Sequence, residues 1–229
     1  MSNIDIIIPA YEEYENLQLL LPRIITVLDT AGLDYRVMLM DRVTSTDKTP
    51  ELQLLHPKVC VFNRYPTDSY GDAVRHGIRQ SEAEYMLFMD ADGSHDPEFI
   101  LRLLEQKKNG EIIIASRYVE GGGSHNGPVL KFMSMLVNLS YRVILQIPAK
   151  DVSNSFKLYK SDILKPLLLK CNNFDIIEEI LYKTLKVNKK IRIVEIPYFF
   201  KERIHGNTKR DLISFSFSFL YTLIRLRLS

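Results

Sequence analysis

The chain has 229 residues, of which 46% are hydrophobic and 25% charged, a globular composition that excludes a disordered chain or a collagen-like fibre. Its two cysteines, Cys60 and Cys171, are too few for a disulfide scaffold or a four-thiolate zinc site. No secretory signal pattern precedes the first apolar run, so we expect a cytoplasmic protein. The net charge is only +2, but residues 201–229 hold six basic and two acidic side chains, which favours contact of this end with phosphates or an anionic membrane.

Short apolar runs of strand length alternate with helical patterns in the first half of the chain. The expected elements, in chain order, are a strand at 4–9, a helix at 12–28, strands at 35–40 and 58–62, a helix at 71–80 and strands at 85–89 and 111–115. A further helix is expected to open at Asp96 as its N-cap, because Pro97 and an acid follow. The alternation predicts βαβ units and a mostly parallel sheet, in which ligands bind beyond the carboxyl ends of the strands.

The second half of the chain is less regular. We expect a flexible hinge at 121–123, helices at 128–145 and 174–186, a loop leading into a strand at 151–159, and an extended segment at 192–200. Because no internal repeat or linker divides the chain, residues 1–210 are expected to form one domain, followed by a C-terminal segment at 211–229.

The C-terminal segment is apolar in its middle and basic at its ends. Residues 212–224 carry no charged side chain, and basic residues flank them on both sides. A membrane-spanning helix needs about 20 apolar residues, so this shorter run favours an amphipathic or apolar helix that lies at the membrane interface. The alternatives are a helix that closes the hydrophobic core and a strand, which the alternating run SFSFSF would also fit.

Two carboxylates, Asp90 and Asp92, directly follow the predicted strand 85–89 with one residue between them. Carboxylate oxygens are the ligands that Mg²⁺ and Mn²⁺ prefer, and such a metal neutralises the charge of a diphosphate leaving group. The alternative is a pair of turn carboxylates, since Asp is common after strands. We favour the metal site because the pair emerges at the sheet edge where ligands bind.

Other polar residues follow the strands at the same edge. Asp41 and Asp47 suit hydrogen bonds to a base or ribose, although an Asx turn explains Asp47 equally well. Arg117 follows the fifth strand, and Arg203 and Lys209 lie in a basic segment; both residue types bind phosphate, and a solvated basic loop is the alternative.

Several motifs are absent. The sequence has no G-x-G-x-x-G after the first strand, no P-loop and no G-x-S-x-G, which disfavours a dinucleotide-binding Rossmann domain, a P-loop NTPase and an α/β-hydrolase. Nucleic-acid binding is disfavoured because Trp is absent and the aromatic residues form no series with the basic ones. His95 has no histidine partner at metal-ligand spacing, so we expect it to make a local hydrogen bond.

Taken together, these residues resemble the family 2 glycosyltransferases with a GT-A fold, and most of all their dolichol- or polyprenyl-phosphate sugar synthases. The resemblance runs from Ile6 to about Lys209. Five segments carry it in order: IIIPAYEEYENL, GDAVRHGIRQSEAEYMLFMDADGSHDPEFI, ASRYVEGGG, DVSNSFKLY and EIPYFFKERIHGNTK. It implies a Rossmann-like, mostly parallel sheet flanked by helices.

The resemblance also implies roles for individual residues. Those expected to line the base and ribose of a nucleotide are Pro9, Tyr11, Glu13 and Asp41. Those expected to hold the metal and the diphosphate are Asp90 and Asp92, with Ser94 at a possible third ligand position. Those expected to face the donor and acceptor phosphates are Arg117, Ser134, Arg203 and Lys209. Among all of these, the expected catalytic residues are Asp92, Arg117, Arg203 and Lys209, and Glu179 matches a further glutamate of the family.

Three positions depart from the family pattern. Arg42 replaces the second of two adjacent acids after the second strand, and the following turn is one residue longer. Leu130 replaces an arginine, with Lys131 beside it, and Lys157 replaces another. These changes bear on base specificity and on the acceptor phosphate, because lysine lacks the bidentate fork of arginine.

The resemblance implies an inverting, Mg²⁺- or Mn²⁺-dependent transfer of a sugar from GDP-mannose or a UDP-sugar to a polyprenyl or dolichyl phosphate, at the cytoplasmic face of the membrane. A lipid phosphate is already anionic and needs no general base. One alternative is transfer to a saccharide hydroxyl, which would need a carboxylate base such as Asp151, Asp175 or Glu179. Another is a non-catalytic subunit that binds sugar nucleotides, made thinkable by the three departures.

Overall fold

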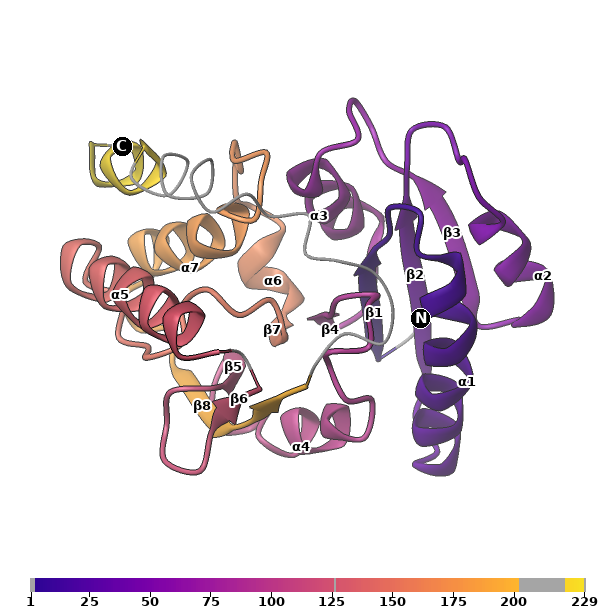
Figure 1. Cartoon of the computed structure of the whole chain (residues 1–229), viewed down its shortest axis with the longest axis horizontal. Coiled ribbons are helices and arrows are strands. Elements are labelled where there is room, and N and C mark those ends of the chain that lie inside the picture. Colours follow the sequence, from indigo (N-terminus) through magenta and orange to yellow (C-terminus); the bar gives the residue numbers. More distant parts are fainter. Residues whose placement is uncertain (1–2, 126, 202–220, 229) are drawn as a thin grey trace.

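A seven-stranded sheet forms the centre of the computed structural model, which describes residues 3–125, 127–201 and 221–228 (Figure 1). The strand order is β3-β2-β1-β4-β7-β5-β8. The strands are β1 (Ile4–Pro9), β2 (Tyr35–Asp41), β3 (Val59–Asn63), β4 (Tyr85–Phe88), β5 (Ile112–Ser116), β7 (Lys157–Lys160) and β8 (Ile193–Pro197). Only β7 runs antiparallel to its neighbours within this sheet, so the predicted mostly parallel α/β sheet is confirmed.

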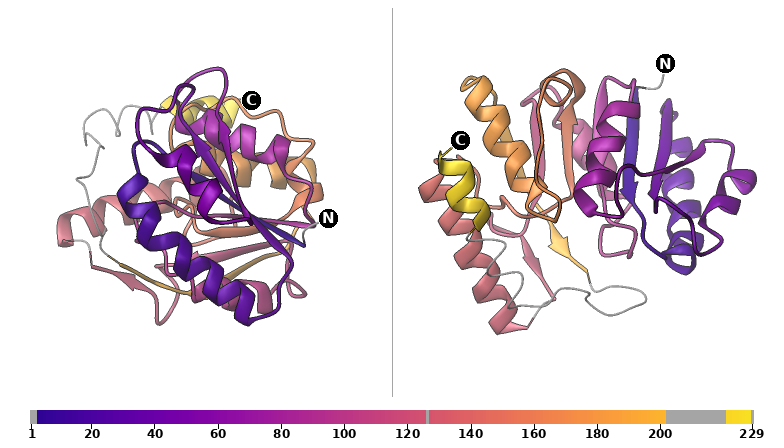
Figure 2. Two further views of the ribbon diagram at one scale, coloured as in Figure 1. Left: turned by 90° about the vertical axis from the view of Figure 1, so that its right-hand side faces the viewer. Right: turned by 90° about the horizontal axis from the view of Figure 1, so that it is seen from above.

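The strands are mostly apolar because both faces of the sheet are covered by helices (Figure 2). In β1, Ile6 and Ile8 enter one hydrophobic cluster and Ile7 enters the other, as the two-residue period of a strand requires. The first cluster lies under α1 (Tyr14–Thr30) and α4 (Phe99–Glu105).

The second hydrophobic cluster lies under the helices of the opposite face. These are α3 (Tyr70–Gln80), α5 (Pro128–Ile144), α6 (Ser161–Leu164) and α7 (Ile176–Val187). Short elements that the sequence patterns did not predict are the 3-10 turn η1 (Thr49–Glu51) and α2 (Leu52–Leu55), together with α6. None of these exceeds one turn, so no amphipathic period announces them.

The start of α4 differs from the prediction. The helix begins at Phe99 rather than after an Asp96 cap. The Asp96 side chain instead forms ion pairs with Arg23 of α1, at 2.7 Å, and with Lys201. A tertiary contact thus takes the carboxylate that the local sequence assigned to a helix cap.

The glycine run at 121–123 is a packed turn, so the predicted flexible hinge is wrong. Gly123 begins the short strand β6 (Gly123–Ser124), which pairs with β9 (Phe199–Phe200). A Cβ at Gly122 would lie 2.4 Å from the carbonyl oxygen of Ser116. Close backbone approach, rather than flexibility, explains the glycine here.

The predicted C-terminal segment, 211–229, lies within the described residues only at 221–228, which are helical. Leu223 and Leu226 are buried in the second hydrophobic cluster, whereas Ile224 and Leu228 are exposed. This part of the segment therefore packs against the domain, as the core-closing alternative expects. No helix among the described residues is both long and apolar enough to cross a membrane.

Candidate active site

The two predicted metal-binding carboxylates lie on one turn after β4, at the carboxyl end of the sheet. Asp92 is buried, and its Oδ1 accepts hydrogen bonds from the backbone N–H of Ser94 at 3.0 Å and from its hydroxyl at 2.5 Å. Asp90 is partly exposed, and its Oδ1 accepts hydrogen bonds from Ser155 at 3.0 Å and from Tyr70 at 3.5 Å. The structure thus brings Asp90, Asp92 and Ser94 together.

The donor set of this turn fits a divalent metal that is shared with a diphosphate. No group of three or more His, Cys, Asp or Glu side chains among the described residues is arranged to hold a metal ion. However, Mg²⁺ in phosphate-transfer sites is usually held by one or two carboxylates, and phosphate oxygens and water complete its octahedral shell. Asp90 and Asp92 supply two carboxylates on one turn, which is what such a site needs from the protein.

A stacked pair of aromatic side chains, His95 and Phe156, supports this turn. The buried ring of His95 stacks on Phe156 with 4.6 Å between centroids, and its Nδ1 accepts the backbone N–H of Asp90 at 2.9 Å. Burial lowers the pKa of His95, which favours the neutral imidazole that this hydrogen bond requires. The predicted local hydrogen bond of His95 is confirmed.

Tyr198 also fixes the turn and was missed by sequence reasoning. Its hydroxyl donates to the carbonyl oxygen of Ser94 at 2.8 Å and accepts the backbone N–H of Asp96 at 2.9 Å. These partners lie more than one hundred residues away in sequence. The only signal in the sequence was an aromatic side chain in the extended segment that follows β8.

A buried arginine, Arg64, joins the carboxyl ends of β1 and β2. Its guanidinium donates to the carbonyl oxygens of Met40 at 2.7 Å and Asp41 at 2.9 Å, and to that of Ala10 just after β1. It also reaches two carbonyl oxygens of the loop before α3, at 3.1 and 3.2 Å. Because its closest partners are backbone carbonyl oxygens of two strand ends, Arg64 holds the predicted nucleotide-binding edge together, and burial lowers its pKa.

Asp41, at the end of β2, carries a buried oxygen that forms no hydrogen bond with any residue the structure describes. Its Oδ2 accepts the hydroxyl of Ser45, whereas Oδ1 has no hydrogen-bond partner among the described residues. Leaving a buried acceptor unpaired costs about 1–3 kcal/mol, so such a group is expected where a ligand or a water completes the bonding. This geometry suits the hydrogen bond to a base or ribose that was predicted for Asp41.

Arg42, one of the departures from the family pattern, lies against Tyr11. Its guanidinium carbon is 4.5 Å from the centroid of the Tyr11 ring. Nη1 lies 2.7 Å from Oε1 of Glu12, and Nη2 lies 3.2 Å from Oδ2 of Asp68. A cation tethered by two carboxylates therefore covers one side of a predicted base-binding residue.

The remaining residues of this edge have structural partners. Pro9 ends β1, and Glu13 directly precedes α1 and accepts the Asn16 amide at 2.6 Å. Asp47 accepts the backbone N–H groups of Tyr14 at 3.1 Å and Thr49 at 2.9 Å. The second bond closes an Asx turn, so the alternative interpretation of Asp47 is confirmed.

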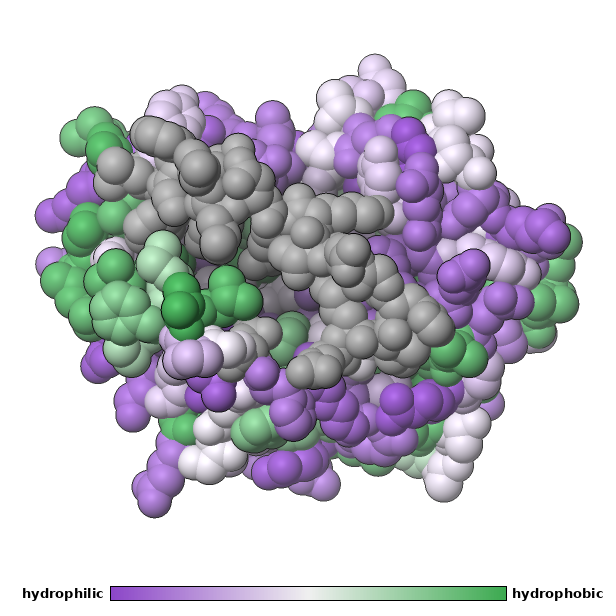
Figure 3. All heavy atoms as spheres, in the orientation of Figure 1, coloured by the Kyte–Doolittle hydropathy of each residue, from purple (hydrophilic) through white to green (hydrophobic). Residues whose placement is uncertain are grey.

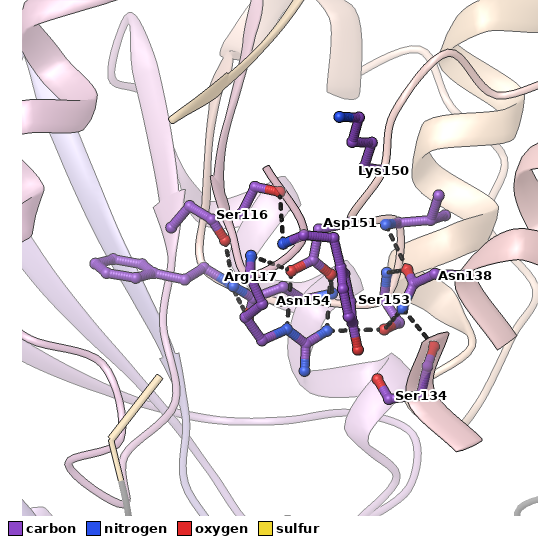
Figure 4. A network of polar contacts seen from close by, with 12 residues as sticks. Ser116, Arg117, Ser134, Asn138, Lys150, Asp151, Ser153 and Asn154 are labelled. Atoms are coloured by element: carbon purple, nitrogen blue, oxygen red, sulfur yellow. Dashed lines mark hydrogen bonds and ion pairs between the residues drawn. The ribbon is translucent and has the colours of Figure 1, made fainter. Parts of the chain in front are cut away.

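On the other side of the sheet's edge, Arg117 follows β5 and pairs with Asp151 (Figure 4). Nε and Nη2 of Arg117 donate to the two oxygens of Asp151 at 2.8 and 2.7 Å, and Nη2 also donates to Ser153 at 3.0 Å. Burial would lower the pKa of Arg117, but Asp151 keeps it above the ordinary value. The pair is thus a fixed, charged element whose cation is already neutralised in part.

Ser134 lies on α5 at the border of the same network (Figure 4). Its carbonyl oxygen accepts the side-chain amide of Asn138 at 2.8 Å, and this amide also donates to Ser153 at 3.0 Å. Leu130 and Lys131 are exposed one turn earlier on α5. Ser134 is therefore linked through its backbone carbonyl, Asn138 and Ser153 to the Arg117–Asp151 pair.

Lys157, another departure, does not reach the surface. Its ammonium is buried and donates to the carbonyl oxygens of Val152, at 3.0 Å, and Asn154. Burial lowers the pKa of Lys157 from 10.5 to about 8. The residue supports the loop that presents Asp151.

Each carboxylate proposed as a base for a hydroxyl acceptor is engaged by the protein. Asp151 binds Arg117, as described above. Glu179 accepts the backbone N–H of Cys171 at 2.7 Å and pairs with Lys183 at 2.7 Å, and Asp175 accepts the hydroxyl of Thr222. Although burial acts against the charged form, these hydrogen bonds lower the pKa of Glu179. The two predicted residues of the basic segment, Arg203 and Lys209, lie outside the described residues.

Comparison with solved structures identifies the fold. The chain superimposes on glucosyl-3-phosphoglycerate synthase from Mycobacterium tuberculosis, crystallised with Mn²⁺, UDP and glucosyl-3-phosphoglycerate, with a TM-score of 0.72 and 15% identity. The match covers 98% of this chain and 80% of that one. A complex of the same enzyme with Mg²⁺ and UDP gives a TM-score of 0.71 at 16% identity. At this level of identity the likeness establishes the GT-A fold.

Comparison with known sequences identifies the family. The chain is 33% identical over 215 residues to the dolichol-phosphate mannosyltransferase of Pyrococcus furiosus, covering 90% of this chain and 58% of that protein. It is 31% identical over 218 residues to the undecaprenyl-phosphate mannosyltransferase of Micrococcus luteus, covering 89% of this chain and 85% of that protein. It thus spans little more than half of the first relative. Residues 5–168 match the family model described as glycosyl transferase family 2. The chain belongs to glycosyl transferase family 2 and is a glycosyltransferase.

Proposed function

We propose that this enzyme transfers a hexosyl group, with inversion, from a nucleotide-diphospho-sugar to a polyprenyl phosphate. The observation that carries the proposal is the turn after β4, where Asp90 and Asp92 stand at the same sheet edge as the unpaired oxygen of Asp41. Relatives named as mannosyltransferases of dolichol phosphate and undecaprenyl phosphate support the acceptor class. They also favour mannose as the sugar.

In the proposed reaction, an oxygen of the lipid phosphate attacks the anomeric carbon as the bond to the nucleoside diphosphate breaks. Asp90 and Asp92 would hold Mg²⁺ or Mn²⁺, which supplies charge neutralisation for the departing diphosphate. His95 and Tyr198 hold the backbone of this turn at Asp90 and Ser94, so little reorganisation of the turn is needed when the donor binds. Asp41 would accept a hydrogen bond from the nucleoside. Arg203 and Lys209 remain proposed phosphate ligands.

The state of the other carboxylates favours a phosphate acceptor over a hydroxyl. A hydroxyl must lose a proton to a base within hydrogen-bond reach. Asp151, Asp175 and Glu179 are each engaged by hydrogen bonds or ion pairs within the protein. A lipid phosphate is anionic near neutral pH and requires only positioning in line with the leaving group.

Helix α5 supports a lipid acceptor and contact with a membrane surface. Its exposed side chains are largely apolar and form a patch, which appears in green on the left of Figure 3, where Figure 1 places α5. They are Val129, Leu130, Phe132, Met135, Leu136, Leu139, Val143 and Ile144. The same helix carries Lys131 and Ser134, so an apolar surface and predicted acceptor-side groups lie together. We propose that α5 contacts the cytoplasmic face of the membrane, together with the C-terminal segment, whose helix at 221–228 packs on the domain but exposes Ile224 and Leu228.

The test is a transfer assay with purified protein, Mn²⁺ and a panel of sugar nucleotides, with and without undecaprenyl phosphate. We expect sugar to appear on the lipid with one donor, and only when both lipid and metal are present. Transfer of the sugar to a saccharide hydroxyl, or nucleotide binding with no transfer to any acceptor, would overturn the proposal of a lipid acceptor.

A further inference from the structure

Tyr70, the first residue of α3, contacts both Asp90 and a loop from the second half of the chain. Its hydroxyl lies 3.5 Å from Oδ1 of Asp90, on the same oxygen that accepts Ser155. The ring of Tyr70 stacks on Phe174 with 4.2 Å between centroids and 27° between planes. The Tyr70 hydroxyl therefore lies at Asp90, a predicted metal ligand, and its ring packs against a loop from the second half of the chain.

That loop, residues 171–175, is held tightly against α3. The backbone N–H of Gly71 donates to the carbonyl oxygen of Asn172 at 2.8 Å, and Arg75 donates to the side chain of Asn172 at 2.9 Å. A Cβ at Gly71 would lie 2.1 Å from the carbonyl oxygen of Cys171, so glycine is required for this approach. Close packing at Gly71 fixes the distance between the loop and the start of α3.

The other side of the same loop is bound by the C-terminal helix at 221–228. Thr222 donates its hydroxyl to Asp175, and Arg225 Nη2 lies 2.5 Å from the sulfur of Cys171. Thr222 is fully buried, as is Leu223 beside it. The chain end is therefore part of the packing that holds Phe174 against Tyr70.

We propose that Tyr70 is a positioning residue for Asp90, and that the C-terminal helix sets the position of Tyr70 through loop 171–175. This inference rests on the proposed function, because Asp90 is taken as a ligand of the metal and diphosphate. Groups that hydrogen-bond to a metal ligand orient it and influence metal affinity. Displacement of the C-terminal helix from the domain would then weaken metal and donor binding. By the same coupling free energy, donor binding would stabilise the packed position of the helix.

The first test measures Mn²⁺ binding, by electron paramagnetic resonance, in the full-length protein with GDP or UDP. Tyr70→Phe removes only the hydroxyl and should weaken Mn²⁺ binding by about 10-fold, the lower end for such partners, because the contact is long. Nucleotide binding without Mn²⁺ and the melting temperature should be unchanged, and the donor KM should rise. Tyr65→Phe, an exposed tyrosine on the loop before α3, is the matched control. Unchanged Mn²⁺ affinity in Tyr70→Phe would overturn the positioning role.

The second test asks whether the C-terminal helix acts through Tyr70. Thr222→Val should weaken Mn²⁺ binding by about 5-fold, a typical coupling between sites, whereas Leu228→Ala on the exposed face of the same helix should not. In the Tyr70→Phe background, Thr222→Val should have little further effect, because the link is already broken. Equal effects of Thr222→Val in both backgrounds would overturn the coupling. If the wild-type protein binds no Mn²⁺ with either nucleotide, the proposed function fails instead.

Discussion

The turn that carries Asp90 and Asp92 and the helix α5 lie on the same domain but are built in opposite ways. The turn is held by hydrogen bonds and aromatic contacts from other parts of the domain, as His95 and Tyr198 illustrate. Helix α5 buries only a narrow stripe, including Val137 and Tyr141, and exposes large apolar side chains such as Phe132 and Leu136.

This contrast reflects what each region is proposed to bind. A charged diphosphate must be stabilised by groups that are already oriented, because reorienting them during the reaction would cost free energy. A lipid chain is recognised by removing apolar surface from water, which demands area but little orientation. Preorganisation is therefore found on the donor side and exposed apolar area on the acceptor side.

The largest expected effect comes from the donor side. Asp92→Asn should lower turnover by more than about 100-fold, since charge neutralisation by a metal is worth several kcal/mol in the transition state. Circular dichroism should show an unchanged fold, and Asp34→Asn, an exposed aspartate, is the control. Near-normal turnover would remove the metal role from this turn.

A second prediction concerns the pair that borders both regions. Asp151→Asn leaves the buried guanidinium of Arg117 without its counter-charge, which should destabilise the fold by about 3–5 kcal/mol. Urea denaturation measures this change. Asp162→Asn breaks an exposed pair with Lys160 and should cost at most about 1 kcal/mol. Comparable losses in the two variants would mean that the Arg117–Asp151 pair is not a structural element.

The apolar character of α5 can be tested without touching the donor side. Phe132→Asp, combined with Leu136→Asp, should reduce co-sedimentation with anionic vesicles by about 10-fold or more, because each buried apolar side chain contributes about 1.5–3 kcal/mol. Thermal stability should change little, since both side chains are exposed. Leu54→Asp on α2 is the control, because Leu54 is also an exposed apolar side chain but lies on another part of the molecule. Unchanged sedimentation of the α5 variant would remove this helix from the membrane contact.

The last prediction concerns a gradual effect, a pH dependence of stability at Lys157. Its pKa falls from 10.5 to about 8 on folding, so between these values the unfolded chain holds a proton that the folded chain has lost. This group therefore makes the free energy of unfolding rise with pH over that window. The difference in unfolding free energy between wild type and Lys157→Met, measured from pH 7 to pH 10, should show this slope. A difference that is flat with pH would contradict the depressed pKa.

Local sequence patterns predicted the strands and the main helices of the sheet. They also placed Asp90 and Asp92 at its carboxyl edge. Two carboxylates that directly follow a buried strand, with one residue between them, lie on the same turn whatever the strand packs against. The start of α4 was mispredicted, since Arg23 takes the Asp96 side chain. The glycine run at 121–123 was mispredicted too, because neighbouring backbone rather than solvent surrounds it.

The sequence by itself determined the order of elements, the two-sided burial of the strands and the placement of polar groups after them, all of which follow from periodicity over a few residues. Only the tertiary structure decided which polar side chains are free to bind a ligand and which serve as internal contacts. It committed Asp151 to Arg117, buried Lys157 and brought Tyr198 to the Ser94 carbonyl. These contacts join residues that are distant along the chain, and no local pattern encodes a distance between two elements until the sheet and its helices have packed.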